Sequence, residues 1–328
     1  MPALTKVEGP TVSPRPERRA GRRSAARRGF TLIEAMVTLT LIGIIVGTLL
    51  DVVMRQQRFA GAANDVMEVR DNLRQIGDLF PMELRAVTPA EGDIFVMSDS
   101  AIEFRQSAGV SVVCDTLPGR TTVILPPTAL ATDAGITSWI AAPAVGDELY
   151  IFDPRGELPD TLIRYTVAAA PTPGPCLPAS GFTTTAAEGA GGLMIAIAPQ
   201  LSPTTPKGAP VRFVRRARYS LYVSPSDGGW YLGFRDFNAS RLPQWSAIQP
   251  VAGPLLPYAA AGAGGLRFQY FDANGVPLTL AAQSTQVRRI DITARAQTRS
   301  PVRTWGFGRT PGDYVRDSVR VSIALRNY

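Results

Sequence analysis

The chain of 328 residues is long enough for one or two domains, and it contains no histidine and two cysteines. The lack of histidine excludes Ser-His-Asp and Cys-His nucleophile systems and every metal site that includes a histidine ligand. The formal net charge of +7 suggests a polyanionic partner, but residues 1–29 hold eight basic and two acidic side chains, which leaves 26 basic and 25 acidic ones in residues 30–328.

An apolar segment from Phe30 to Leu50 follows this basic leader, and Glu34 is its only charged residue. Its length is close to the ~20 residues that cross a bilayer as a helix, and no small-x-small signal-peptidase site follows it directly. Positive charge beside a membrane helix stays in the cytoplasm. The sequence therefore predicts a single-pass inner-membrane protein with a cytoplasmic N-terminus and a periplasmic C-terminal domain. On hydropathy alone, this pattern is that of a signal anchor that holds an exported domain.

The junction between leader and apolar segment carries the most specific signal, because residues 29–37 read GFTLIEAMV. Together with the basic leader and the apolar run, this stretch resembles the processing motif of type IV prepilins and type II secretion pseudopilins. The resemblance implies that a prepilin peptidase cleaves between Gly29 and Phe30 and N-methylates Phe30, the new first residue. The leader of 29 residues departs from the family, in which many leaders are much shorter.

The resemblance also gives Glu34 a role in assembly. An unpaired carboxylate in hydrocarbon is costly, so it needs a partner. Cleavage would create a positively charged amine on Phe30, four residues earlier and on the same helix face. Glu34 would then neutralise the amine of its own chain or that of a neighbouring subunit. The family favours the neighbour, whereas the residues alone leave both pairings open.

Beyond Leu50, apolar residues recur at spacings of three and four, as in the exposed-and-buried pattern of an amphipathic helix. No proline occurs between Phe30 and Phe80, and Pro81 is expected to kink the last turns or start a new helix. We predict one helix over residues 30–87, ~85 Å long at ~1.5 Å per residue. Its first half (30–50) would span the membrane, and its second half would pack on a globular domain.

From Thr88 onward, short apolar or alternating runs separated by Pro- and Gly-rich turns predict a β domain over residues 88–328. The expected strands are Asp93–Met97, Ala101–Gln106, Ser111–Cys114, Thr121–Leu125, Glu148–Phe152, Thr161–Val167, Leu193–Ala198, Val211–Val223, Trp230–Phe237, Leu266–Phe271, Val287–Ala296 and Ser318–Leu325. Ala168–Ala190, Ser202–Pro210 and Arg299–Asp313 are expected as exposed loops. The predicted fold class is α+β, with a long N-terminal helix packed on a large, mostly antiparallel β domain, as in pilins.

Cys114 and Cys176 lie in the exported part and are expected to form one disulfide, with two separate thiols as the alternative. An arginine cluster is interpreted as a solvated sheet face, although a local basic patch leaves nucleic acid as an unlikely but open partner. That cluster consists of Arg212, Arg215, Arg216 and Arg218.

A group of acidic residues around one expected strand lacks the spacing of a calcium loop and is interpreted as solvated turn carboxylates. The group consists of Asp147, Glu148, Asp153 and Asp160. No phosphate loop follows a strand, and no serine or cysteine has a base in a recognised motif. We therefore expect no metal, no cofactor and no enzymatic activity.

The last third of the chain resembles the strand series of PilW-like minor pilins and of J-type pseudopilins. The leading functional hypothesis is a minor pilin of a type IV pilus that is processed by prepilin peptidase and incorporated at low copy to prime or cap the fibre. Its partners would be the peptidase, inner-membrane lipid before assembly, and other pilin or pseudopilin subunits through the N-terminal helix. The alternatives are a J-type pseudopilin of type II secretion, a DNA-uptake minor pilin, and a signal-anchored exported enzyme.

Overall fold

The computed structural model describes residues 31–133, 135–154, 161–260, 263–302 and 313–325. The chain divides into two compact units, residues 1–57 and 58–328, and the division falls inside the first helix. Globular packing therefore begins well before residue 88, because the second part of that helix belongs to the unit that contains the strands.

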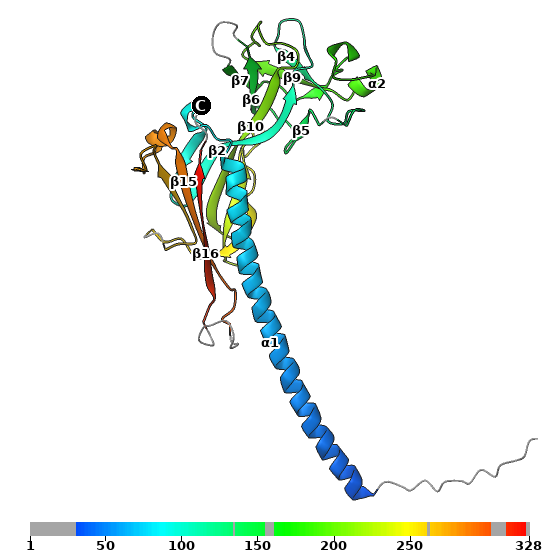
Figure 1. The fold of residues 1–328 in the computed structure, drawn as a ribbon, viewed down its shortest axis with the longest axis vertical. Coiled ribbons are helices and arrows are strands. Elements are labelled where there is room, and N and C mark those ends of the chain that lie inside the picture. Colours follow the sequence, from blue (N-terminus) through cyan, green and yellow to red (C-terminus); the bar gives the residue numbers. More distant parts are fainter. Residues whose placement is uncertain (1–30, 134, 155–160, 261–262, 303–312, 326–328) are drawn as a thin grey trace, which may run out of the picture. The chain divides into compact units, whose positions relative to one another are not determined.

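The described elements follow a simple order of one long helix and then strands (Figure 1). The helices are α1 (Leu32–Leu84), α2 (Ala186–Gly189) and the 3₁₀ helices η1 (Pro89–Glu91), η2 (Pro178–Ser180) and η3 (Ala281–Gln286). The strands are β1 (Ile94–Met97), β2 (Ala101–Val112), β3 (Asp115–Thr116), β4 (Thr122–Leu125), β5 (Ser138–Trp139), β6 (Glu148–Asp153), β7 (Thr161–Val167), β8 (Thr172–Pro173), β9 (Leu193–Ala198), β10 (Pro210–Val223), β11 (Trp230–Asp236), β12 (Gln249–Leu255), β13 (Leu266–Phe271), β14 (Pro277–Leu278), β15 (Arg289–Gln297) and β16 (Arg316–Ala324).

Helix α1 consists of two successive parts that differ in burial. Every residue from Leu32 to Gly61 is exposed, and apolar side chains dominate the start of this part. From Val66 onward, an apolar stripe at spacings of three and four is buried, and it consists of Val66, Val69, Leu73, Ile76, Phe80 and Leu84. The helix continues through Pro81 and ends at Leu84, three residues before the expected Val87.

The strands pair antiparallel throughout, which confirms the predicted α+β class. Two long strands organise the sheet: β10 pairs with β2 from Pro210 to Ser220. On its other edge, β10 pairs with β6 through residues 211–214 and with β11 through residues 217–223. The change of partner falls beside a bulge between Phe213 and Val214, and Figure 1 shows β2 and β10 running between the two groups of strands.

Two apolar cores result from this change of partner. The first packs the stripe of α1 on β1, β11, β13, β15 and β16, with Phe80 edge-on to Tyr219 and Phe268 at ring-centroid distances of 5.3 and 5.4 Å. The second core lies between β4, β6, β7, β9 and the first part of β10, around Leu149, Tyr165 and Phe213. Burial of the α1 stripe fixes the second half of the helix to the sheet through the hydrophobic effect.

Some strand predictions differ from the structure. The expected strand Ser111–Cys114 is largely the end of β2, which runs unbroken from Ala101 to Val112. Strand β12 was not predicted, because Pro250 and Pro254 argue against a central strand. The structure accommodates both prolines with register shifts against β11 and a single register pair to β15. The expected loop Ala168–Ala190 is in fact partly ordered into β8, η2 and α2.

Candidate functional site

The first turn of α1 holds the expected assembly carboxylate, whereas Gly29 and Phe30 lie outside the described residues. Thr31 precedes the helix, and its Oγ1 accepts a hydrogen bond from the backbone N–H of Glu34 at 3.3 Å. Thr31-Leu32-Ile33-Glu34 is therefore the Thr-x-x-Glu pattern of a capping box, a signal that was missed in the sequence. A carboxylate in the first turn also interacts favourably with the positive end of the helix dipole.

The threonines of the apolar segment satisfy their hydroxyls within the helix. Thr38 donates to the carbonyl oxygens of Glu34 and Ala35, both at 2.9 Å. Thr40 and Thr48 donate in the same way to Val37 and Ile45, also at 2.9 Å. Because hydrocarbon offers no alternative partner for a hydroxyl, these bonds make the segment compatible with lipid.

Two glycines give the same segment a flat face. Gly43 and Gly47 are four residues apart, the Gly-x-x-x-Gly spacing at which two membrane helices approach closely. An added Cβ at either position would meet no atom within 4 Å in the structure. A larger side chain at either position would therefore clash with no atom of the described chain.

Among the described helices, α1 is the one that is long and apolar enough to cross a membrane. None of the residues in its most apolar stretch is buried. A salt bridge between Asp51 and Arg55, 2.9 Å from Arg55 to the carboxylate, lies just past the expected end of the span. Both side chains are exposed, so their pairing contributes a few tenths of a kcal/mol at most. The first charged residues after Glu34 thus occur where a helix would leave the hydrocarbon.

Three arginines of the predicted basic patch on β10 are engaged within the domain, so the expectation of a solvated sheet face is wrong for them. Arg212 donates to the carbonyl oxygen of Ala86 at 3.0 Å. Arg215 donates to both carboxylate oxygens of Asp147, at 2.8 and 2.6 Å. Arg216 is paired with the buried Glu103, and only Arg218 of the four is exposed.

Arg215 of β10 and Arg105 of β2 belong to a layer of paired charges near the bulge of β10. Hydrogen bonding to Asp147 raises the pKa of Arg215 despite its burial, and the charges of Asp147 and Asp236 add to this effect. Burial alone would lower the pKa of Arg105, but the hydrogen bond and charge of Glu148 outweigh it, so that this pKa is also raised. Both guanidinium groups therefore stay charged, and they stabilise the structure by pairing with buried acids.

Two members of the acidic group around β6, Asp147 and Asp153, are likewise not solvated as expected. Asp147 and Asp153 are 3% and 2% exposed, because Arg215 covers the first and Thr204 donates to the second at 2.6 Å. Asp160 lies outside the described residues. Among the residues that the structure does describe, no three cysteine or acidic side chains gather in a way that would hold a metal ion.

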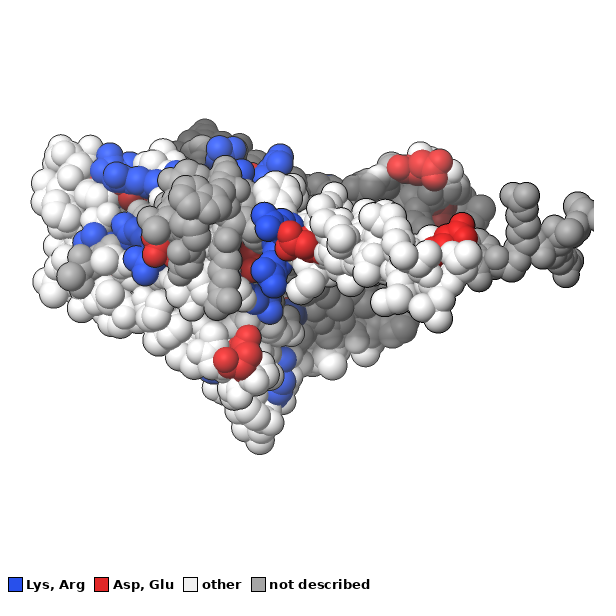
Figure 2. All heavy atoms as spheres, turned by 90° about the horizontal axis from the view of Figure 1, so that it is seen from below, with Lys and Arg blue, Asp and Glu red and all other residues white. Residues whose placement is uncertain are grey.

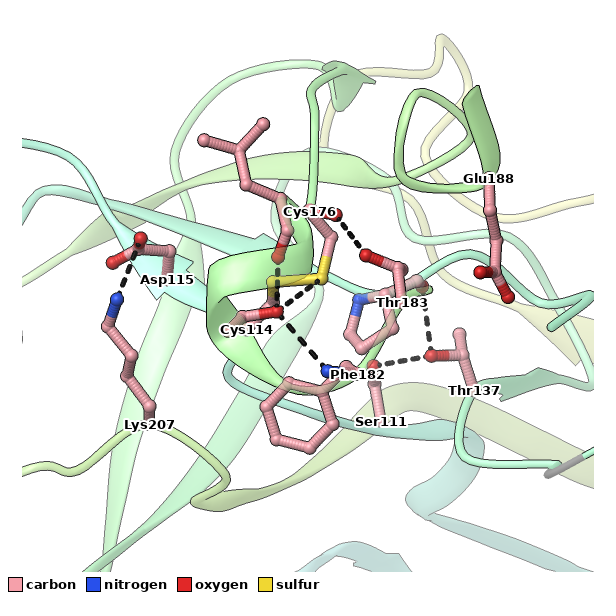
Figure 3. The surroundings of a disulfide bond; sticks show 12 residues. Ser111, Cys114, Asp115, Thr137, Cys176, Phe182, Thr183, Glu188 and Lys207 are labelled. Atoms are coloured by element: carbon pink, nitrogen blue, oxygen red, sulfur yellow. Dashed lines mark hydrogen bonds and ion pairs between the residues drawn. A yellow bond between two sulfur atoms is a disulfide. The ribbon is translucent and has the colours of Figure 1, made fainter. Parts of the chain in front are cut away.

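Cys114 and Cys176 form a disulfide with a Cα–Cα distance of 5.9 Å (Figure 3). Both residues are fully buried beside Ile124, Phe182 and Met194. Cys176 lies within the predicted loop 168–190, whose backbone is held by Thr183, because its hydroxyl donates to the carbonyl oxygen of Cys176 at 2.8 Å. The bond joins the end of β2 to a segment 62 residues away.

Glu188 stabilises the same part of the domain from outside. Its carboxylate accepts hydrogen bonds from the hydroxyl and the N–H of Thr184, at 2.7 and 2.6 Å, and from the N–H of Ala131 at 2.6 Å. Hydrogen bonding to Thr184, followed by that to Ala131, lowers the pKa of Glu188 to about 2. The ionised carboxylate thus fastens the start of α2 to the loop that contains Ala131.

One comparison with known proteins gives a match. A family model described as the prokaryotic N-terminal methylation motif matches residues 24–50, which include Gly29, Phe30 and Glu34. No curated protein matches the chain, and no solved structure matches it. The motif supports a type IV pilin-like protein that is processed by a prepilin peptidase and assembles with other pilins, and it fits an inner-membrane anchor.

Proposed function

We propose that the chain is a minor pilin of a type IV pilus, incorporated at low copy to prime or cap the fibre. The observation that carries the proposal is the coincidence of the methylation motif at residues 24–50 with the exposed apolar half of α1. An apolar surface of this length, rimmed by charged residues only at its ends, requires lipid before assembly and other helices after it. Its role is structural and not catalytic.

The processing reaction supplies the partner of Glu34. Cleavage after Gly29 would leave the amine of Phe30 four residues before the carboxylate, within reach along one helix face. In a low-dielectric surrounding, the pairing of the two charges offsets part of their desolvation. When the partner amine belongs to the preceding subunit, the pair also fixes the axial position of the incoming helix.

Two features of the β domain support a low-copy subunit of PilW-like type. The compact unit that contains the strands extends over residues 58–328, and its size is awkward to repeat throughout a thin fibre. The strands β10, β13, β15 and β16 are those whose sequences resemble the PilW-like and J-type series. The buried disulfide supports an oxidising compartment, in agreement with a periplasmic domain before assembly.

The N-terminal mass tests the proposal. In cells with prepilin peptidase, we expect a chain that begins at methylated Phe30, and in cells without the enzyme a chain that retains the leader. Gly29→Ala should block the conversion in the first strain. A chain that still begins before Phe30 in wild-type cells would refute the hypothesis that the protein is a pilin. Labelling of isolated fibres then separates a pilus subunit from a J-type pseudopilin, which would be found with the secretion apparatus.

A further inference from the structure

The outward face of the sheet formed by β13, β15 and β16 is rich in arginine. The registers pair Arg267 with Thr293 and Thr293 with Arg320, so these three side chains form a row across the three strands. The alternate residues face inward, since Ile290, Ile292 and Phe268 lie in the first core. Because side chains alternate between the faces of a strand, the other residues share the outer face with this row. Five arginines lie on this outer face, and we call them the arginine face: Arg267, Arg289, Arg295, Arg316 and Arg320.

Charge is unevenly divided between this face and the rest of the chain. Against five arginines, the outer face holds one acidic residue, Asp291, which is 4% exposed beneath Arg289 and Arg320. Residues 30–328 carry 26 basic and 25 acidic side chains, so 21 basic and 24 acidic ones lie elsewhere, a net of −3. The sheet face therefore carries a clear excess of basic residues, although residues 30–328 as a whole are nearly neutral. Figure 2 shows several separate groups of arginine and lysine side chains on the face that it draws, with acidic groups among them.

Arg295 donates to the carbonyl oxygen of Gly264 at 3.1 Å and Arg316 to the side-chain oxygen of Gln297 at 3.4 Å, whereas the other three arginines of this face are held less fully than those of β10. Among the described residues, Arg267 has no hydrogen-bond or ion-pair partner, and Arg320 is 67% exposed although it contacts Asp291 at 2.8 Å. The Nε of Arg289 is 3.2 Å from Asp291 but is not aligned for a hydrogen bond, and this buried donor has no acceptor in the described chain. Guanidinium donors are thus left over for a partner of opposite charge.

We propose that the arginine face binds double-stranded DNA through its phosphates. The arginines extend from the row of Arg289 to the row of Arg316, eight residues along β15, or roughly 27 Å. A linear polyanion fits such an array, and duplex DNA presents about 16 phosphates over that length. The planar guanidinium suits bidentate contact with phosphate oxygens. The ring of Phe271 already lies under Arg289 at 4.2 Å, so it offers no open platform for an unpaired base.

Binding of this kind is insensitive to sequence and sensitive to salt. Each phosphate contact contributes about 0.9 to the slope of log affinity against log salt. The double variant R267Q/R320Q should therefore lower the magnitude of the slope by about 2 and weaken binding by at least about tenfold at 50 mM salt. R267Q alone removes a guanidinium without a described partner, so it leaves the fold intact and should give about half of the slope change.

The test uses the full chain solubilised in nonionic detergent and a labelled DNA duplex of random sequence, with fluorescence anisotropy from 50 to 200 mM salt. The control R164Q/K207Q removes two exposed charges on and near the other core and should leave the slope unchanged. The basic leader is the same in every variant, so its contribution cancels. Equal slopes for wild type and R267Q/R320Q, or an equal loss in the control, would overturn the proposal. So would binding of wild type to phosphatidylglycerol vesicles without binding to DNA.

Discussion

Removal of the disulfide should loosen one of the two cores while it spares the other. The bond closes a loop of 62 residues, and the entropy of that closure in the unfolded chain corresponds to about 4 kcal/mol. Since about 1.4 kcal/mol is tenfold, C114A/C176A should raise the population of the opened state roughly a thousandfold. Alanine is chosen because a serine hydroxyl at either fully buried position would add the cost of an unsatisfied polar group.

Amide hydrogen exchange on the detergent-solubilised chain measures the effect locally. The N–H of Cys176, bonded to the carbonyl oxygen of Gly189 at 3.0 Å, and its neighbours through Gly192 should exchange much faster in the variant. The amides of β15 in the first core serve as the internal reference. Chemical reduction of wild type should reproduce the change and should have no effect on the variant. Unaltered exchange in segment 172–192, or equal acceleration in β15, would show that the bond does not stabilise this part of the fold.

Three further substitutions address helix α1 and the carboxylate of Glu188. E34Q retains a side chain suited to the capping box but removes the charge, so it should be cleaved normally and enter fibres poorly, whereas incorporation at the wild-type level would exclude the charge pair. G43L/G47L should leave folding and processing unchanged, because nothing lies within 4 Å of either added Cβ and leucine favours the helix; it should reduce incorporation into fibres, and the control I44L should not. For Glu188, the folded-state pKa of about 2 lies below the ordinary value of 4.5, so its stabilisation is complete above about pH 4.5 and is lost as the pH falls through about 2. The difference in unfolding midpoint between wild type and E188Q should accordingly vanish near pH 2, and a difference that persists there would contradict the assigned role.

The parts of the fold that follow a local period were predictable from the sequence. The stripe from Val66 to Leu84 repeats every three to four residues, and it is buried as predicted. Strands β7, β9 and β13 have the predicted bounds, since each is a short alternating or apolar run between turn residues. Strand β12 was missed because its prolines are tolerated only where the pairing is irregular, which depends on neighbours distant in sequence.

The roles of the charged residues could not be predicted, because their partners are far away in the chain. Arg212, Arg215 and Arg216 bond to residues 126, 68 and 113 positions away, so no local pattern distinguishes them from a solvated face. The arginine face arises in the same way, from three strands that are brought together only by folding. The Thr31–Glu34 cap, in contrast, was visible as a spacing and was overlooked.

The two arginine sets should therefore respond oppositely to substitution. R215M leaves the buried Asp147 without its guanidinium partner, which costs about 3–5 kcal/mol for a broken buried pair. R320Q breaks a pair whose arginine is 67% exposed, so it costs about 0–1 kcal/mol. The double variant D147N/R215M removes both charges and should regain much of the stability that R215M loses.

Denaturant unfolding of the three variants, followed by tryptophan fluorescence, tests this contrast, and Trp139 reports on the second core because its ring packs on Phe213 at 5.0 Å. If R215M unfolds at the wild-type midpoint, the Arg215–Asp147 pair is not structural and the basic sequence of β10 becomes available for ligands. If R215M is destabilised and D147N/R215M recovers, the arginines of β10 serve the fold, and electrostatic binding must be sought on the arginine face.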